Sequence, residues 1–74
     1  MQEKKFIIMQ LNCNGLNKHL SEIRLHIYKR KPDVVCLCET FVTLKYQPKF
    51  TGYTAYWKHR EDRNKGGLLI LVRQ

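Results

Sequence analysis

Long apolar runs are missing from this sequence, and cysteines are few. No apolar stretch approaches the roughly 18 residues that read as a membrane-crossing helix, so the chain is expected to have no membrane span. The opening stretch, MQEKKF, lacks the apolar centre of a secretory signal peptide. The three cysteines are odd in number, and two of them lie inside an apolar run, so they do not suggest a disulfide framework. We therefore expect a reduced intracellular protein with buried thiols and no visible targeting signal.

Two sequence motifs that would indicate other functions are also missing. Cys36 and Cys38 are separated by one residue inside a strand-like run, whereas zinc sites use a pair separated by two to four residues. A zinc site that also used Cys13 and His59 therefore does not match the spacing. Gly66-Gly67 is not followed by Lys-Ser or Lys-Thr, so it is not a phosphate-binding loop.

Acidic residues are scarce relative to basic ones. Fourteen Lys and Arg stand against six Asp and Glu, which gives a formal net charge of +8. Such an excess suits a polyanionic partner, most often nucleic acid. The cations are spread along the chain without an arginine-rich tract, so they are also compatible with ordinary solvated faces.

The first forty residues contain the patterns of a strand, a helix and a second strand. Residues 6–11, FIIMQL, have strand length and composition. A helical stripe follows at spacings of four, three and four, formed by Leu16, Leu20, Ile23 and Ile27. Asn17 is the expected N-cap, and Pro32 is expected to end the helix by excluding Lys31 from the α region. Residues 33–38, DVVCLC, form the expected second strand.

The rest of the chain reads as a long loop followed by two strands. Residues 40–50 show no period and contain Pro48. GYTAYWKH alternates, with Tyr53, Ala55 and Trp57 on one face, and LLILVR has the composition of a buried strand. The two segments are expected to pair antiparallel. The predicted fold class is α/β: a β-α-β unit followed by a β-hairpin.

Polar side chains follow both strands of the predicted β-α-β unit. A crossover helix makes its two strands parallel, so their carboxyl ends meet at one edge of the sheet, where ligands bind in such folds. Asn12 and Asn14 follow the first strand, and Glu39 follows the second. A carboxylate with amide oxygens beside it suits Mg²⁺ or Mn²⁺. The alternative on pattern alone is a solvated glutamate at the start of a loop.

Four ordered blocks give the sequence a family resemblance. They are MQLNCNGL, PDVVCLCET, the F-x-GY pattern at Phe50 to Tyr53, and DRNKGGLLILVR. Together they resemble the endonuclease/exonuclease/phosphatase superfamily, and within it the apurinic-type endonuclease of non-LTR retrotransposons. The resemblance implies the N-terminal portion of a four-layer α/β/β/α fold, an α+β sandwich in which two sheets pack face to face. Leu11 stands where the family usually has Trp, and Cys38 where it usually has Gln.

The resemblance also implies roles for individual residues. Glu39 matches the metal-binding glutamate, and Asn12 matches the asparagine that helps hold the metal and the scissile phosphate region. Asn14 stands where many members have Asp, so it is a candidate for a supporting contact. Arg63, in a basic region beside a Tyr-rich strand, is a candidate for a nucleic-acid contact. The metal implied is Mg²⁺ or Mn²⁺, bound only in a completed domain, because the catalytic Asp-x-Asn and Asp-His pairs of the family lie beyond residue 74.

Two functional hypotheses follow. In the first, residues 1–74 are the partial N-terminal portion of a metal-dependent DNA endonuclease, truncated or decayed and inactive alone. The parent enzymes nick target DNA to prime reverse transcription, with a linked reverse transcriptase domain and element RNA as partners, in the nucleus. In the second, the chain is a non-enzymatic basic module that binds nucleic acid.

The same resemblance leads to an expectation about stability. A sheet face predicted to lack its partner sheet would leave the isolated chain marginally stable. The residues assigned to that face are Ile7, Met9, Val35, Leu37, Leu69 and Leu71.

Overall fold

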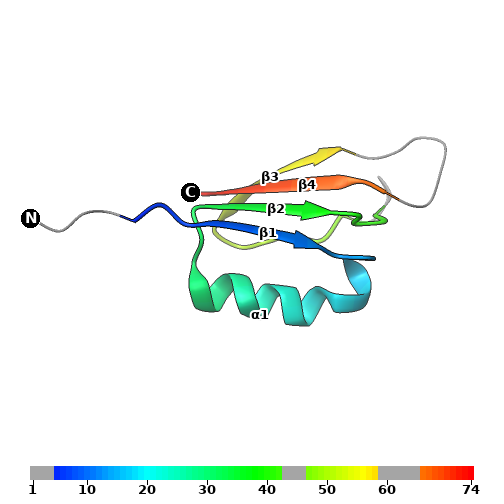
Figure 1. The fold of residues 1–74 in the computed structure, drawn as a ribbon, viewed down its shortest axis with the longest axis horizontal. Coiled ribbons are helices and arrows are strands. Elements are labelled where there is room, and N and C mark those ends of the chain that lie inside the picture. Colours follow the sequence, from blue (N-terminus) through cyan, green and yellow to red (C-terminus); the bar gives the residue numbers. More distant parts are fainter. Residues whose placement is uncertain (1–4, 43–46, 59–65) are drawn as a thin grey trace, which may run out of the picture.

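The structure, a computed structural model, describes residues 5–42, 47–58 and 66–74 and shows one sheet with one helix packed against it (Figure 1). The elements are β1 (Ile8–Asn12), the short 3-10 helix η1 (Asn17–His19), α1 (Leu20–Arg30), β2 (Val34–Cys38), β3 (Tyr53–Lys58) and β4 (Leu68–Arg73). Among the residues described, no helix has both the length and the apolar character needed to cross a membrane. Arg63 and His59 lie outside the described residues.

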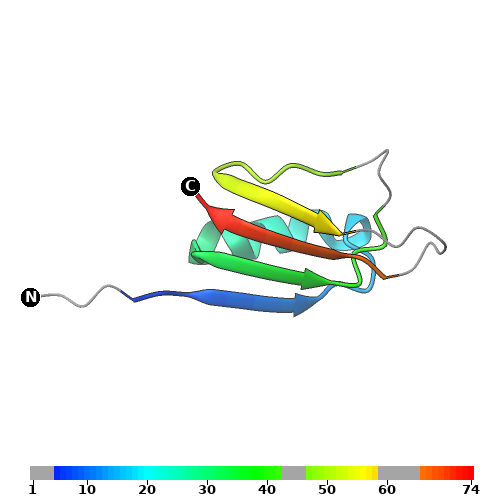
Figure 2. The same ribbon diagram turned by 90° about the horizontal axis from the view of Figure 1, so that it is seen from above.

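The strands form one mixed sheet in the order β1-β2-β4-β3. β1 and β2 are parallel, with Asn12 opposite Cys38 at their carboxyl ends. β4 runs antiparallel to both β2 and β3. The predicted fold class, β-α-β followed by an antiparallel hairpin, is therefore confirmed. Figures 1 and 2 show that β4, the last strand in the sequence, lies between β2 and β3.

The helix ends as predicted but begins differently. Lys31 adopts a left-handed conformation with φ of 49°, and its N–H donates to the carbonyl of Ile27 at 2.8 Å, immediately before Pro32. The predicted N-cap role of Asn17 is wrong, because Asn17 lies within η1 and His19 precedes α1 without a side-chain cap. The cause is tertiary. Leu16 is fully buried and its N–H donates to Thr40 at 2.8 Å, so the turn that leads into the helix is fixed before Asn17.

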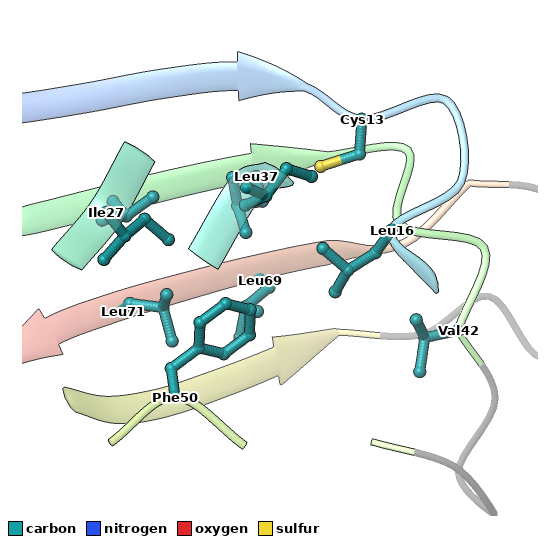
Figure 3. Packing of buried hydrophobic residues seen from close by; sticks show 10 residues of the cluster. Cys13, Leu16, Ile27, Leu37, Val42, Phe50, Leu69 and Leu71 are labelled. Atoms are coloured by element: carbon teal, nitrogen blue, oxygen red, sulfur yellow. The ribbon is translucent and has the colours of Figure 1, made fainter. Parts of the chain in front are cut away.

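The core lies between the sheet and α1, as Figure 3 shows. Ile23 and Ile27 of α1 pack there with side chains from the central strands. The buried hydrophobic residues are Cys13, Leu16, Ile23, Ile27, Val35, Leu37, Val42, Phe50, Leu69 and Leu71. The two central strands show alternation, because β2 buries Val35 and Leu37 and β4 buries Leu69 and Leu71 while the residues between them are only partly buried. That alternation is what a sheet covered on one side produces.

One prediction about the two faces of the sheet is wrong. Val35, Leu37, Leu69 and Leu71, assigned to an uncovered face, are fully buried against the helix layer. Ile7 precedes β1 and is 42% exposed. The uncovered side is the opposite one, which we call the open face. It consists of Ile8, Gln10, Asn12, Val34, Cys36, Cys38, Thr54, Tyr56, Lys58, Leu68, Ile70 and Val72. Both faces of β2 and β4 are apolar, so alternation alone could not say which of them the helix would cover.

The segment before β3 completes the helix layer. Phe50 is buried, and the Arg24 guanidinium lies 5.5 Å from the centre of its ring. Arg24 also donates to the carbonyl of Lys49 at 2.7 Å, and the Thr51 N–H donates to the Tyr28 hydroxyl at 3.1 Å. These contacts join the segment to α1 across about twenty-five positions of sequence.

The alternation predicted for β3 is only partly observed. Tyr53 and Trp57 pack partly buried against the core, whereas Ala55, predicted to share their face, is exposed. Tyr56, on the open face, is 60% exposed.

Candidate functional site

The carboxyl ends of β1 and β2 lie side by side, and the segments after them stay together. The Cys13 N–H donates to the carbonyl of Cys38 at 2.9 Å, and the Gly15 N–H donates to the carbonyl of Glu39 at 2.9 Å. A further bond of 2.8 Å joins Leu16 to Thr40. The structure thus brings Asn12, Asn14 and Glu39 to one edge of the sheet, where the sequence predicted a ligand site. Figure 1 shows the ends of β1 and β2 beside each other at this edge.

The two asparagines build the turn that follows β1. The Asn14 N–H donates to the Asn12 side-chain oxygen at 3.2 Å, which is the bond of an Asx turn. Asn14 has φ of 47°, a left-handed conformation that asparagine tolerates better than most residues. Both residues are exposed. The turn therefore fixes the direction of the chain after Asn12 while leaving amide groups accessible to a ligand.

Glu39 occupies an unusual backbone conformation. Its φ is 52° and that of Phe41 is 57°, so two non-glycine residues in left-handed conformations flank Thr40. Each such conformation costs on the order of 1–3 kcal/mol and persists only where the surrounding structure holds it in place. Bonds on both sides hold the segment: Gly15 donates to Glu39, and Phe41 donates to the carbonyl of Gly66 at 2.8 Å. Glu39 is exposed, and its constrained backbone fixes the point at which its side chain leaves the sheet edge.

Thr40, which sequence reasoning did not single out, anchors this segment in the interior. It is only 1% exposed, and within the described residues its hydroxyl oxygen has no hydrogen-bond partner. A Cβ placed on Gly67 would lie 2.6 Å from that oxygen. Gly67 has φ of +93°, so this position requires glycine for both conformation and space. This close approach of Gly67 to Thr40 joins the segment that follows β2 to the start of β4.

A hollow beside the strand ends is lined by ionisable side chains that the sequence analysis did not single out. It has a volume of about 360 Å³ and lies between β1 and α1. His19, Glu22 and His26 line it together with Asn12 and Asn14. These three residues are three and four positions apart in the sequence, so they lie on one side of the helix. That spacing is the sequence signal that could have identified them. Glu39 does not line this hollow, so the hollow and the Glu39 carboxylate are separate features.

The described residues supply only part of a metal centre. No group of three or more His, Cys, Asp or Glu side chains that could hold a metal ion occurs in residues 5–42, 47–58 and 66–74. Asp33 lies at the other end of the sheet, before β2, so it cannot contribute to this edge. The donor set present, one carboxylate with neighbouring amide oxygens, is the hard-oxygen type that fits Mg²⁺ or Mn²⁺ and needs further ligands.

Comparisons with known proteins agree with the fold described above. A family model described as the endonuclease/exonuclease/phosphatase family matches residues 9–74. The fold is similar to that of an AP endonuclease from Archaeoglobus fulgidus, with a TM-score of 0.81 and 22% identity over 92% of this chain. It is also similar to a 3'-5' exonuclease from Neisseria meningitidis, with a TM-score of 0.78 and 23% identity over 89% of this chain. The chain spans 27% of the length of each.

Proposed function

Because the chain belongs to the endonuclease/exonuclease/phosphatase family, we propose that residues 1–74 are the N-terminal portion of a metal-dependent DNA endonuclease domain. The observation that carries the proposal is the meeting of Asn12 and Glu39 at the carboxyl edge of β1 and β2. The two solved structures of similar fold are named as an AP endonuclease and a 3'-5' exonuclease, which supports a nuclease rather than a phosphatase.

In the proposed site Glu39 and Asn12 hold the metal. Mg²⁺ or Mn²⁺ would supply Lewis-acid stabilisation of the phosphate oxygens and activation of water. The Glu39 carboxylate would neutralise part of the cation's charge. The Asn12 side chain, whose oxygen accepts from the Asn14 N–H, would help to hold the metal and the scissile phosphate region. Asn14 is proposed as a supporting contact and Arg63 as a contact to the DNA backbone. The remaining ligands and the water-orienting groups would come from a longer chain, so the 74-residue chain is proposed to be inactive alone.

The finer proposal is a retrotransposon source. It is supported by the combination of NCNG, PDVVCLCET and DRNKGG in that order. In that setting the domain would nick target DNA in the nucleus, and a linked reverse transcriptase would extend the new 3' end on element RNA. A downstream coding sequence with Asp-x-Asn, Ser-Asp-His and a reverse transcriptase would support this source, and an unrelated downstream domain would contradict it.

The test of the site uses a completed domain in which these 74 residues are joined to a relative's remaining sequence. Glu39→Gln is expected to abolish Mg²⁺-dependent nicking of supercoiled plasmid, because glutamine keeps the shape and loses the charge that a hard cation requires. Glu3→Gln, the same change at a position outside the residues that the family model matches, is the matched control and is expected to retain nicking. Circular dichroism should be unchanged in both. Near-normal nicking by Glu39→Gln would refute the metal role.

A second candidate function is a non-enzymatic basic module, and the distribution of exposed cations favours it. Lys29, Arg30 and Lys31 are exposed together at the end of α1, and the net charge is +8. Tyr56 and Lys58 are both exposed on β3, where a base could stack and a phosphate could bind. Tyr53 and Trp57 pack against the core and are less available. DNA binding without cleavage by the 74-residue chain would agree with either proposal. The completed domain distinguishes them, because nicking would support the endonuclease and its absence would favour the binding module.

A further inference from the structure

The segment that carries Glu39 is joined through the main chain to the turn that follows β1. The carbonyl of Glu39 accepts from the Gly15 N–H at 2.9 Å. The carbonyl of Thr40 accepts from the Leu16 N–H at 2.8 Å. Gly15 and Leu16 come directly after the turn built by residues 12–14. The backbone of Glu39 therefore has a fixed place relative to the two asparagines of that turn.

The start of β4 holds the same segment from the other side. The Phe41 N–H donates to the carbonyl of Gly66 at 2.8 Å, and the Thr40 N–H donates to the carbonyl of Gly67 at 3.4 Å. Thr40 is only 1% exposed, although it follows the exposed Glu39 directly. The segment after β2 is thus enclosed between the turn after β1 and the beginning of β4.

The fit between Thr40 and Gly67 leaves no room for another atom. A Cβ on Gly67 would lie 2.6 Å from the Thr40 hydroxyl oxygen, so either residue would have to shift. That oxygen has no hydrogen-bond partner among the residues that the structure describes. The contact therefore acts through the volume that Thr40 fills rather than through a hydrogen bond.

A shift of Thr40 would reach Glu39 directly. Glu39 and Phe41, the two neighbours of Thr40, have positive φ values of 52° and 57°. Such conformations persist only where the surrounding structure holds them in place. If Thr40 moves, Glu39 is free to return to a commoner backbone conformation, and its side chain then leaves the sheet edge in another direction.

We propose that Thr40 and Gly67 are positioning residues for the metal site: their contact holds the main chain of Glu39 and so sets the place of its carboxylate relative to Asn12. The inference rests on the proposed function, which assigns Glu39 to a metal. Mg²⁺ demands a nearly ideal octahedral arrangement of its ligands, so a displaced carboxylate binds it poorly. Loss of a residue that holds a metal ligand in place typically costs about 10- to 100-fold in metal affinity.

The test measures the Mn²⁺ affinity of the completed domain by electron paramagnetic resonance of free Mn²⁺, which needs no catalytic turnover. Gly67→Ala is expected to weaken binding by about tenfold. Gly52→Ala is the matched control, because Gly52 has φ of +85° but nothing within 4 Å of a new Cβ. Gly52 precedes β3 at the end of the sheet opposite to Asn12 and Glu39. Its substitution should leave the Mn²⁺ affinity within about twofold of the unmodified domain, because distant sites act independently.

A second pair of variants separates positioning from a general loss of stability. Thr40→Ala removes the volume that encloses the segment and should weaken Mn²⁺ binding without introducing a clash. In the double variant Thr40→Ala, Gly67→Ala, the smaller residue 40 leaves room for the new methyl group. The Mn²⁺ affinity of this double variant should therefore exceed that of Gly67→Ala. Every affinity is measured at a temperature at which circular dichroism shows that the variant is folded.

Glu39→Gln is the reference that makes the outcomes distinguishable. An unchanged Mn²⁺ affinity in Glu39→Gln would show that the metal role of Glu39 is wrong, and the positioning role with it. Suppose instead that Glu39→Gln weakens binding, whereas folded Gly67→Ala and Thr40→Ala bind Mn²⁺ as tightly as Gly52→Ala. The metal role of Glu39 would then stand, and the positioning role would be refuted. If Gly67→Ala does not fold, the comparison of Thr40→Ala with Gly52→Ala decides alone.

Discussion

The Arg73 guanidinium at the end of β4 donates to the Asp33 carboxylate at the start of β2, with an Nη2–Oδ1 distance of 2.7 Å. The same carboxylate accepts from the Ile7 N–H at 2.8 Å through its other oxygen. Arg73 also donates through Nη1 to the carbonyl of Lys31 at 3.0 Å. One ion pair therefore ties together the beginnings of β1 and β2, the end of α1 and the end of β4.

Removing this pair is expected to destabilise the sheet more than loss of a typical surface ion pair. Exposed pairs contribute about 0–1 kcal/mol, but Asp33→Asn also weakens a charge-assisted bond to a backbone N–H, so we expect a loss of about 1–2 kcal/mol. Urea unfolding of Asp33→Asn, Arg73→Met and the double variant measures the coupling. Strict additivity of the two single effects would show that the pair contributes no interaction energy.

Gly67→Ala is expected to be more damaging than the same substitution at Gly15 or Gly52. The new Cβ meets the Thr40 hydroxyl oxygen at 2.6 Å, and the positive φ adds strain of about 1–2 kcal/mol. Gly52→Ala is the control, because Gly52 has φ of +85° but nothing within 4 Å of a new Cβ. Gly52→Ala should show the conformational cost alone, and Gly67→Ala a further loss of about 1–3 kcal/mol from overpacking. Equal losses of unfolding free energy in Gly67→Ala and Gly52→Ala, measured by chemical unfolding, would disprove the clash. Adding Thr40→Ala to the Gly67→Ala variant should recover part of the difference in stability.

The open face makes the isolated chain prone to self-association. Ile8 is 65% exposed and Val72 is 38% exposed beside half-buried neighbours on β2 and β4. We expect weak near-ultraviolet dichroism from Trp57, a broad thermal transition, and oligomers in sedimentation experiments, because an uncovered apolar sheet face and its edges associate. A sharp cooperative transition from a soluble monomer would show instead that this segment is a self-sufficient domain.

Neighbouring residues of β4 provide a paired test of the two faces. Val72→Lys adds charge to the open face and is expected to reduce association while leaving helical dichroism intact. Leu71→Lys places charge in the fully buried layer against α1 and is expected to unfold the chain. Unfolding by both variants would mean that the open face is also covered in solution.

DNA binding by the 74-residue chain is expected to depend steeply on salt and weakly on sequence. With about 4–6 phosphate contacts, affinity should fall by roughly 10²- to 10³-fold between 50 and 200 mM salt. Lys29→Ala with Arg30→Ala should reduce the salt slope by about 2 if the end of α1 contacts phosphates, and Lys58→Ala tests the surface around Tyr56 in the same way. Fluorescence anisotropy titrations measure both. An affinity that barely changes over this range of salt would argue against binding led by charge.

Much of the fold was predictable from local patterns. The apolar runs FIIMQL, DVVCLC and LLILVR gave three strands to within about two residues at their ends, and the Leu16 to Ile27 stripe identified the helical segment. Pro32 marked the end of α1 because it restricts the residue before it. The meeting of Asn12 and Glu39 at one edge followed from the parallel pairing that a crossover helix imposes. These features depend on short-range sequence or on a general rule of connection.

Only the tertiary structure decided the remaining features, because each depends on contacts between distant segments. β4 lies between β2 and β3 since its Leu69 and Leu71 face Leu37 and Val35 across the register, and local pattern cannot choose such partners. The helix covers the Val35 face and leaves the Cys36 face open, although both are apolar. Leu16, bound to Thr40, moved the start of the helix away from an Asn17 cap. Residue type and spacing thus determined the elements and their candidate ligands, whereas packing over long separations determined which face is buried and how Glu39 is held.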